Sequence, residues 1–529
     1  MKNVEIALIL NAHLPFVRHP EYPVFLEERW LFEALSETYL PLLRVFHKLE
    51  EDGVPFRLTM SFSPTLTAML TDPLLKDRYR RYLELQIELA EKELSRTAAD
   101  PVMNKVAQMY RRLYKHNQGD FIDVYQGNIL RGFSYFQKKG YLEILTTAAT
   151  HAVLPLYQDS PEAITAQIQV AIESYQRNFS RLPRGFWIPE CAYYPGLETL
   201  LKRNKIEYFF SASHAVLLGK DFPLRGVFAP VSLANGMLVF PRDMTSTNAV
   251  WSRDKGYPSD PVYRDFYRDI GFDLDEKYLE AYTEGANGRF ATGFKYHSVT
   301  GATDHKLPYQ PDVASQKVVE HAKAFLEARL RHAKQLSDVG FDRVPLVTAP
   351  FNAELFGHWW FEGPQWIDAV FREAVNRPEV GFVTPGDVLL DETEFQKTEI
   401  PFSSWATGGY AEVWVDGAND WILRHTHQIV KRMSELVERF PDIQGRKERA
   451  LNQAAREVLL AQASDWPLIL KMGTTVGYAE KRVKEHISNF NRIYESLSSN
   501  AVDTEWLTSL EKKNNIFPFI DYRIFRKIP

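Results

Sequence analysis

Short apolar runs alternate with longer amphipathic patterns over about the first 400 residues, and this alternation restricts the chain to few architectures. The runs of strand length are Val4–Leu10, Phe56–Ser61, Ile206–Ser211, Val344–Ala349 and Val380–Thr384. Helical patterns separate them, with one apolar face formed by residues 79, 82, 86, 90 and 94 and another by residues 319, 322, 326, 330 and 333. Strands that alternate with helices usually pair in parallel beneath those helices. We therefore expect a barrel-like α/β domain with insertions.

The sequence changes character after about residue 420, where strand patterns cease. Three helical patterns follow: Asp420–Phe440, Lys447–Ala461 and Val476–Tyr494. In the last of them, apolar residues recur at helical spacing and form a stripe along one face. This pattern predicts a helical C-terminal domain.

Composition excludes several classes of function. The net charge of -5 argues against nucleic acid or an anionic membrane as the main partner, since both favour basic surfaces. The single cysteine, Cys191, excludes an intrachain disulfide and a cysteine-based zinc site. No run reaches the 18 or more apolar residues of a membrane span, and Val4–Leu10 lacks the flanks of a signal peptide. We expect a cytoplasmic protein without a cofactor or bound metal, and the oligomeric state stays open.

Five segments place polar, acidic or aromatic side chains where a strand is expected to end. Active sites of parallel barrels are assembled at the carboxyl ends of the strands. In chain order the candidates are Asn11 and His13; Glu143 and His151; Trp187 and Glu190; Asn352, Glu354, His358, Trp359 and Trp360; and Trp405 and Trp414. The segment from Met244 to Asp269 is rich in turn formers and aromatic residues, which predicts a long excursion over such a site.

Glu190 is the strongest of these candidates. It lies in the otherwise apolar segment Gly185-Phe-Trp-Ile-Pro-Glu-Cys-Ala-Tyr193. Burying an ionised carboxylate is costly unless it is paired or used, which favours a functional role. The other candidates have structural alternatives: a histidine can cap a strand end, and a tryptophan can simply pack in the core. Trp30, Asp465 and Trp466 are weaker candidates, since they fit an amphipathic helix or a helix cap equally well.

These five segments resemble, in order and position, the five sequence regions of glycoside hydrolase family 57, especially its α-glucan branching enzymes and AmyC-type amylases. Further stretches share the resemblance, among them His19-Pro-Glu-Tyr22, Gly256-Tyr-Pro-Ser-Asp-Pro261 and Leu460-Ala-Gln-Ala-Ser-Asp-Trp-Pro467. The resemblance implies a distorted (β/α)7 barrel with helical insertions and an all-α C-terminal domain. It places the barrel at residues 1–400, with insertions at about 70–125 and 190–260, and the helical domain at 401–529.

The resemblance also implies that the substrate is an α-1,4-glucan, such as glycogen, starch or maltooligosaccharides. It implies a retaining mechanism with Glu190 as nucleophile, followed by transfer to a glucan hydroxyl in branching enzymes or to water in amylases. Trp30, Trp405 and Trp414 match aromatic residues near the glucan groove of that family. Asp465 matches a position in the helical domain that faces the site.

The chain departs from the family at the position of the general acid/base. The family carries Asp in the pattern Asp-x-Glu-Leu-Phe-Gly-His, whereas this chain has Asn352. An amide neither gives nor takes a proton near neutral pH, so catalysis is expected to be impaired. The first region departs as well, since Asn11 stands where the family usually has a histidine, and Ala406 and Phe272 replace a frequent glycine and tryptophan.

Three explanations of Asn352 are open. The residue is an engineered change that traps substrate, or it is natural and leaves a silent glucan-binding or regulatory protein, or Glu354 takes over the acid/base role. The second departure at Asn11 favours the natural explanation, since a trapping variant needs one change. A metal-dependent polysaccharide deacetylase is a further alternative, but the sequence offers no matching set of aspartate and spaced histidine ligands.

Overall fold

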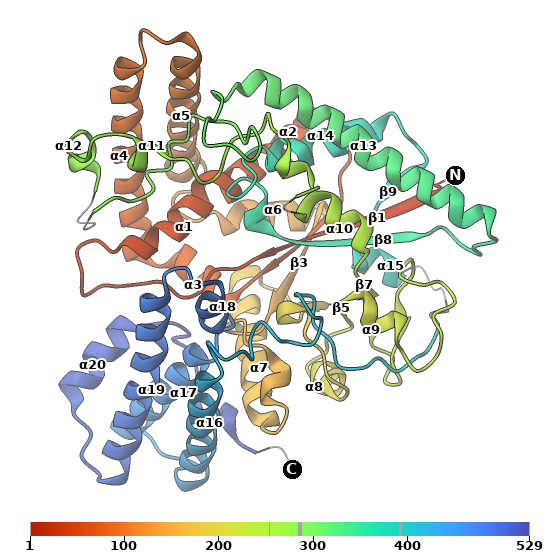
Figure 1. The fold of residues 1–529 in the computed structure, drawn as a ribbon. Helices are drawn as coiled ribbons and strands as arrows, with labels where there is room; N and C mark the ends of the chain where they lie inside the picture. The colour runs from red at the N-terminus through yellow and green to blue at the C-terminus, as the bar shows by residue number, and fades with distance from the viewer. Residues whose placement is uncertain (1, 253, 284–287, 391–393, 528–529) are drawn as a thin grey trace.

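A curled, mostly parallel sheet forms the centre of the molecule (Figure 1). The computed structural model describes residues 2–527 except 253, 284–287 and 391–393. Within these residues the sheet has nine strands in the order β6-β7-β5-β4-β3-β2-β1-β8, and β9 pairs with the amino end of β1. The strands are β1 (Val4–Ala12), β2 (Leu58–Phe62), β3 (Leu142–Thr147), β4 (Gly185–Trp187), β5 (Tyr208–Ser211), β6 (Val231–Ser232), β7 (Leu238–Pro241), β8 (Leu346–Asn352) and β9 (Val380–Phe382).

The strands from β7 to β8 form the distorted (β/α)7 barrel that we expected. Every neighbouring pair along this path is parallel, and only β6 runs antiparallel, against β7. A backbone hydrogen bond of 2.8 Å from the Asp243 amide to the Thr348 carbonyl oxygen joins the end of β7 to β8. Strands such as β1 and β2 are almost wholly buried because parallel sheets are covered on both faces.

Helices cover the sheet on both sides. In Figure 1, α2 (Leu40–Glu51), α13 (Pro311–Asp338) and α14 (Gly363–Val375) lie above the sheet, whereas α7 (Pro161–Phe179) lies below it. The shorter helices are α1 (Arg29–Ala34), α3 (Pro64–Thr71), α6 (Leu130–Lys139), α8 (Leu197–Arg203), α9 (Ser213–Leu217), α10 (Met244–Trp251), α11 (Ile270–Asp273), α12 (Glu276–Leu279) and α15 (Pro385–Leu390). None of the helices within the described residues is long and apolar enough to cross a membrane.

Two long helices, α4 (Pro73–Arg96) and α5 (Pro101–Gly119), pack side by side and project from the barrel in Figure 1. Each begins with an Asp-Pro pair. Asp72 accepts a hydrogen bond from the Leu75 amide, and Asp100 accepts from the amides of Val102 and Met103. Proline suits the first helical position because its missing N–H leaves no bond unmade. Both helices lie within residues 70–125, where a helical insertion was expected.

The prediction of a second helical insertion at residues 190–260 is wrong. That region contributes β5, β6 and β7 to the sheet, with only short helices between them. β6 and β7 form a hairpin around Asn235 and Gly236, and Gly236 has a φ of 78°. An Asn-Gly pair between apolar residues is a strong hairpin signal, so the sequence alone could have predicted this hairpin.

The C-terminal part is helical, and each of the three helices expected there is present. It contains α16 (Trp421–Arg439), α17 (Arg446–Ala461), α18 (Asp465–Met472), α19 (Val476–Ser498) and α20 (Thr504–Lys513). α17 packs against α19, where the buried Glu457 carboxylate lies 2.7 Å from His486 Nδ1. The loop between α17 and α18 reaches the carboxyl ends of the barrel strands, as shown by an isolated bridge between Ala152 and Ala463.

Candidate active site

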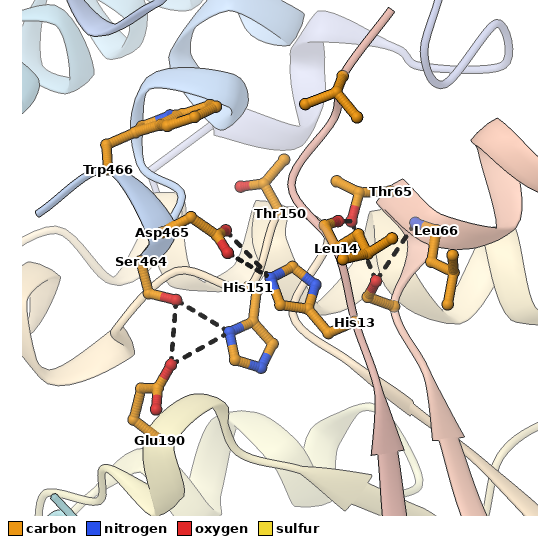
Figure 2. A network of polar contacts seen from close by, with 12 residues as sticks. His13, Leu14, Thr65, Leu66, Thr150, His151, Glu190, Ser464, Asp465 and Trp466 are labelled. Carbon is orange, nitrogen blue, oxygen red and sulfur yellow. Dashed lines mark hydrogen bonds and ion pairs between the residues drawn. The ribbon is translucent and has the colours of Figure 1, made fainter. Parts of the chain in front are cut away.

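A polar network gathers at the carboxyl ends of the barrel strands (Figure 2). His13 follows β1, His151 follows β3 and Glu190 follows β4. Ser464 and Asp465 join them from the start of α18. Residues from distant parts of the chain thus meet at one mouth of the barrel, where parallel barrels hold their active sites.

Glu190 is held rigidly in a short turn, Pro189–Cys191. Glu190 and Cys191 have φ values of 60° and 47°, which non-glycine residues adopt only where the surroundings impose them. Glu190 is 9% exposed; its Oε2 accepts from Trp405 Nε1 at 2.8 Å, and its Oε1 accepts from Ser464 Oγ at 3.2 Å. The Trp405 amide also donates to the Glu190 carbonyl oxygen at 2.9 Å. These contacts fix the direction in which the carboxylate points.

Two stacked histidines lie beside Glu190. His13 and His151 have ring centroids 3.9 Å apart. His151 Nδ1 lies 2.9 Å from Ser464 Oγ and 3.5 Å from Glu190 Oε1. His13 Nε2 lies 3.0 Å from the Asp465 carboxylate (Figure 2). The network therefore contains two imidazoles and two carboxylates in direct or near contact.

Burial and charge set the protonation of this network. Burial raises the pKa of Glu190 to about 7, although the hydrogen bond from Trp405 acts in the opposite direction. Burial works against a charge on His13, but the nearby Asp465 and Glu354 carboxylates outweigh it and raise the pKa of His13. Burial, together with the charge of His13, lowers the pKa of His151. The arrangement favours a cationic His13, a neutral His151 and a carboxylate at Glu190 that titrates near neutral pH.

The end of β8 places Asn352 at the same mouth. Asn352 pairs with Asn11 in the β1–β8 register, and partners in a parallel ladder face the same side of the sheet. The Asn11 amide nitrogen lies 3.4 Å from His151 Nε2, and its oxygen accepts from Ser61 Oγ at 2.6 Å. Asn352, half-buried, is thus one strand away from the network that includes Glu190.

Glu354 is occupied by two hydrogen bonds. Its Oε1 accepts from the Tyr39 hydroxyl at 2.5 Å and from the His13 amide at 3.1 Å. Burial raises the pKa of this carboxyl. We infer that Glu354 fixes the backbone at His13, which argues against its use as a replacement acid/base.

Two predicted site residues lie elsewhere. β3 begins at Leu142, so Glu143 stands at its amino end and accepts a 2.8 Å hydrogen bond from the Gly386 amide. The prediction that Glu143 lines the site is therefore wrong, because the strand starts at this residue instead of ending near it. His358 belongs to a separate network, with its Nδ1 2.7 Å from Glu37, which also pairs with Arg264.

The predicted tryptophans divide into buried and accessible rings. Those with at most 1% exposure pack in the core and present no surface to a ligand: Trp187, Trp360, Trp414 and Trp466. Trp30 and Trp405 are half-buried, and Trp359 is 52% exposed. Trp187 packs edge-to-face against Trp405, with ring centroids 5.2 Å apart, and so helps to hold Trp405 in place.

Sequence reasoning missed several residues of the site. Ser464, which contacts Glu190, and Tyr39, which contacts Glu354, were not predicted, since a hydroxyl is common anywhere in a chain. The excursion predicted at 244–269 begins as α10, whose Trp251 is 46% exposed and lies 6.1 Å from the Trp405 ring. The Arg242 guanidinium, just before this excursion, lies 5.6 Å from the centroid of the Trp405 ring. The aromatic residues of that excursion were the feature of the sequence that could have predicted Trp251 beside the site.

No group of three or more His, Cys, Asp or Glu side chains is placed to hold a metal ion in the part of the chain that the structure describes.

Comparison with known proteins links this site to a family. The sequence pattern described as glycosyl hydrolase family 57 matches residues 7–389, and that described as 1,4-alpha-glucan branching enzyme, C-terminal, matches residues 425–525. The solved α-amylase AmyC of Thermotoga maritima is 42% identical, with a TM-score of 0.94 and 100% of each chain covered.

Branching enzymes are also similar to the chain. The GH57-type branching enzyme of Pyrococcus horikoshii is 33% identical, with a TM-score of 0.88, over 100% of this chain and 97% of that one. A 1,4-alpha-glucan branching enzyme of Thermococcus kodakarensis is 31% identical over 97% of this chain and 77% of its own length.

Proposed function

Because the chain belongs to glycoside hydrolase family 57, we propose that it binds α-1,4-glucans at the Glu190 network and acts on them as a branching enzyme or amylase does. The proposed substrates are glycogen, starch and maltooligosaccharides. The observation that carries the proposal is the Glu190 carboxylate, fixed by Trp405 and Ser464 at the mouth of the barrel. A buried, oriented carboxylate with a perturbed pKa is the usual form of a catalytic acid, base or nucleophile.

Glu190 is proposed to act as the nucleophile of a retaining mechanism. Its ionised oxygen attacks the anomeric carbon, the glycosidic bond breaks, and a glycosyl ester forms on Glu190. The cationic His13 lies near enough to favour the ionised form of Glu190. Water or a glucan hydroxyl then attacks the ester and releases the product with its original configuration.

Asn352 is proposed to make natural substrates react slowly. A sugar alkoxide is a poor leaving group, and it needs a proton that an amide cannot supply. The same residue supports a second candidate function, a glucan-binding or regulatory protein with no turnover, and Asn11 in the first region adds to it.

A substrate with a better leaving group distinguishes the two candidates. Fluoride departs from α-maltosyl fluoride with its electron pair and needs no proton, so Glu190 is expected to form the ester despite Asn352. The second step also needs an acid/base, so the ester accumulates. Intact-protein mass spectrometry then detects one added maltosyl group, and mass spectrometry of the proteolytic fragments locates it on Glu190. Maltooligosaccharide binding without fluoride release supports the silent protein instead, whereas the absence of both contradicts both candidates.

The hydrogen bond from Trp405 is expected to set the pH dependence of this reaction. Since burial raises the pKa of Glu190 to about 7, fluoride release should fall as the pH drops below that value and the carboxyl takes up a proton. Trp405→Phe keeps an aromatic ring but removes the Nε1 donor that stabilises the charged form. We expect the midpoint of the profile to rise by about one pH unit.

Fluoride release measured against pH checks this expectation. Trp251→Phe is the matched control, because Trp251 lies beside the Trp405 ring without a hydrogen bond to Glu190. A Trp405→Phe profile that coincides with that of the unaltered protein would show that the bond does not control Glu190.

A further inference from the structure

An exposed tryptophan lies close to the candidate site without belonging to its polar network. Trp359 is 52% exposed, whereas the adjacent Trp360 is 1% exposed and packs in the core. One face of Trp359 is stacked on Phe266, with ring centroids 4.3 Å apart and an interplanar angle of 25°. Because that face is covered, its exposed area belongs to the opposite face and the edges.

Phe266, Tyr267 and Trp359 together form what we term the aromatic platform. Tyr267 is 70% exposed and meets Phe266 edge-to-face at 5.2 Å. Lys295, itself 5% exposed, places its Nζ 4.0 Å from the Phe266 ring centroid. The Lys295 ammonium is thus largely withdrawn from solvent, so the exposed part of the platform offers flat apolar area.

Buried contacts anchor the platform from below. His358, next to Trp359, lies 2.7 Å from Glu37, which pairs with the buried Arg264. Gly357 makes the close approach of this segment possible, since it has a φ of 117° and a Cβ there would lie 1.8 Å from the Glu37 carbonyl oxygen. The ring is therefore held in place before any ligand arrives, which reduces the entropy lost on binding.

Hydrogen bonds through Glu354 link the platform to the candidate active site. The Trp359 amide donates to the Glu354 carbonyl oxygen at 3.2 Å. The Glu354 carboxylate in turn accepts from the His13 amide, and His13 stacks on His151 beside Glu190. One residue thus connects the platform to the network that the proposed function places around the substrate.

We propose that the aromatic platform is an outer binding site for an α-glucan chain, which engages sugar units beyond those held at the Glu190 network. This inference rests on the proposed function. A pyranose ring has an apolar C–H face, and a fixed, half-exposed tryptophan offers a matching flat surface. The uncharged polymer needs no ionic partner, in agreement with the burial of Lys295.

Affinity as a function of chain length tests the outer site. Trp359→Ala in the full chain is expected to weaken binding of glycogen and maltoheptaose by roughly 10-fold, while maltotriose binding changes little. Trp359→Phe should keep most of the affinity, because a ring remains for stacking. Calorimetric titration gives the values for the oligosaccharides, and affinity electrophoresis gives those for glycogen.

Two further variants make the result specific. Tyr267→Ala removes a ring that is 70% exposed and should cause a smaller loss in the same direction, without any risk to the core. Tyr135→Ala is the matched control, since that exposed ring contacts the Glu50 carboxylate on a different helix. It should leave the affinity for every ligand unchanged.

The outcomes separate this inference from the proposed function. Unchanged glycogen affinity in both the Trp359 and Tyr267 variants overturns the outer site while the proposed function stands. An equal loss for maltotriose and glycogen also overturns it, because Trp359 would then act at the inner site. If the unaltered protein binds none of the three glucans, the proposed function itself is wrong and the outer site falls with it.

Discussion

Replacing Asn352 with aspartate is expected to raise the rate of glucan cleavage or transfer by about 10²–10⁴-fold, the usual contribution of general acid–base catalysis. The carboxyl would stand at the end of β8, at the mouth where Glu190 is already fixed by two hydrogen bonds. It could protonate the departing glucan oxygen and then activate the acceptor. Reducing-end release and branch formation from amylose are the two measurements.

The gain should depend on Glu190. Asn352→Asp combined with Glu190→Gln is the control, because the restored acid has no function without the nucleophile. Asn11→His, made separately, tests whether the first region also needs repair. If Asn352→Asp leaves both rates at the level of the unaltered protein, with the fold intact by circular dichroism, Asn352 does not limit this site.

Glu190→Gln should abolish the reaction with α-maltosyl fluoride, with a loss on the order of 10⁴-fold or more in fluoride release. Glutamine has nearly the same shape and keeps an oxygen that can accept from Trp405 Nε1. What it loses is the negative oxygen that we propose as the nucleophile. Affinity for maltoheptaose should therefore change by only a few-fold.

Glu143→Gln is the matched control for this experiment. Burial raises the pKa of Glu143 as it does that of Glu190, but Glu143 lies at the amino end of β3. The control should release fluoride at the unaltered rate. Full fluoride release by the Glu190→Gln variant would exclude Glu190 as the nucleophile.

Much of the fold could be predicted because burial leaves a regular pattern. Each of the five predicted apolar runs overlaps a strand, since strands covered on both faces are rich in apolar residues. The strands that were not predicted are short or carry polar residues: β4 has three residues, and β3 ends in Thr146 and Thr147. Such strands form because they pair with neighbouring strands, although their own sequence gives only a weak strand pattern.

The candidate site could be predicted only where a residue type is costly to bury. Glu190 stood out because a carboxylate in an apolar segment requires a reason, and the structure surrounds it with hydrogen-bond donors. Ser464 could not be found, because a hydroxyl costs little anywhere. His358 was expected at the site, yet it points to Glu37, a partner 321 residues away that no local pattern reveals.

The Ser464 hydroxyl that holds Glu190 comes 274 residues later in the chain. During synthesis, the barrel strands and the carboxylate leave the ribosome long before this hydroxyl and the Asp465 carboxylate that contacts His13. An unfinished polypeptide that ends before Ser464 therefore carries Glu190 without two of the groups of this network. We expect the network around Glu190 to be complete only once the start of α18 has docked at the mouth of the barrel.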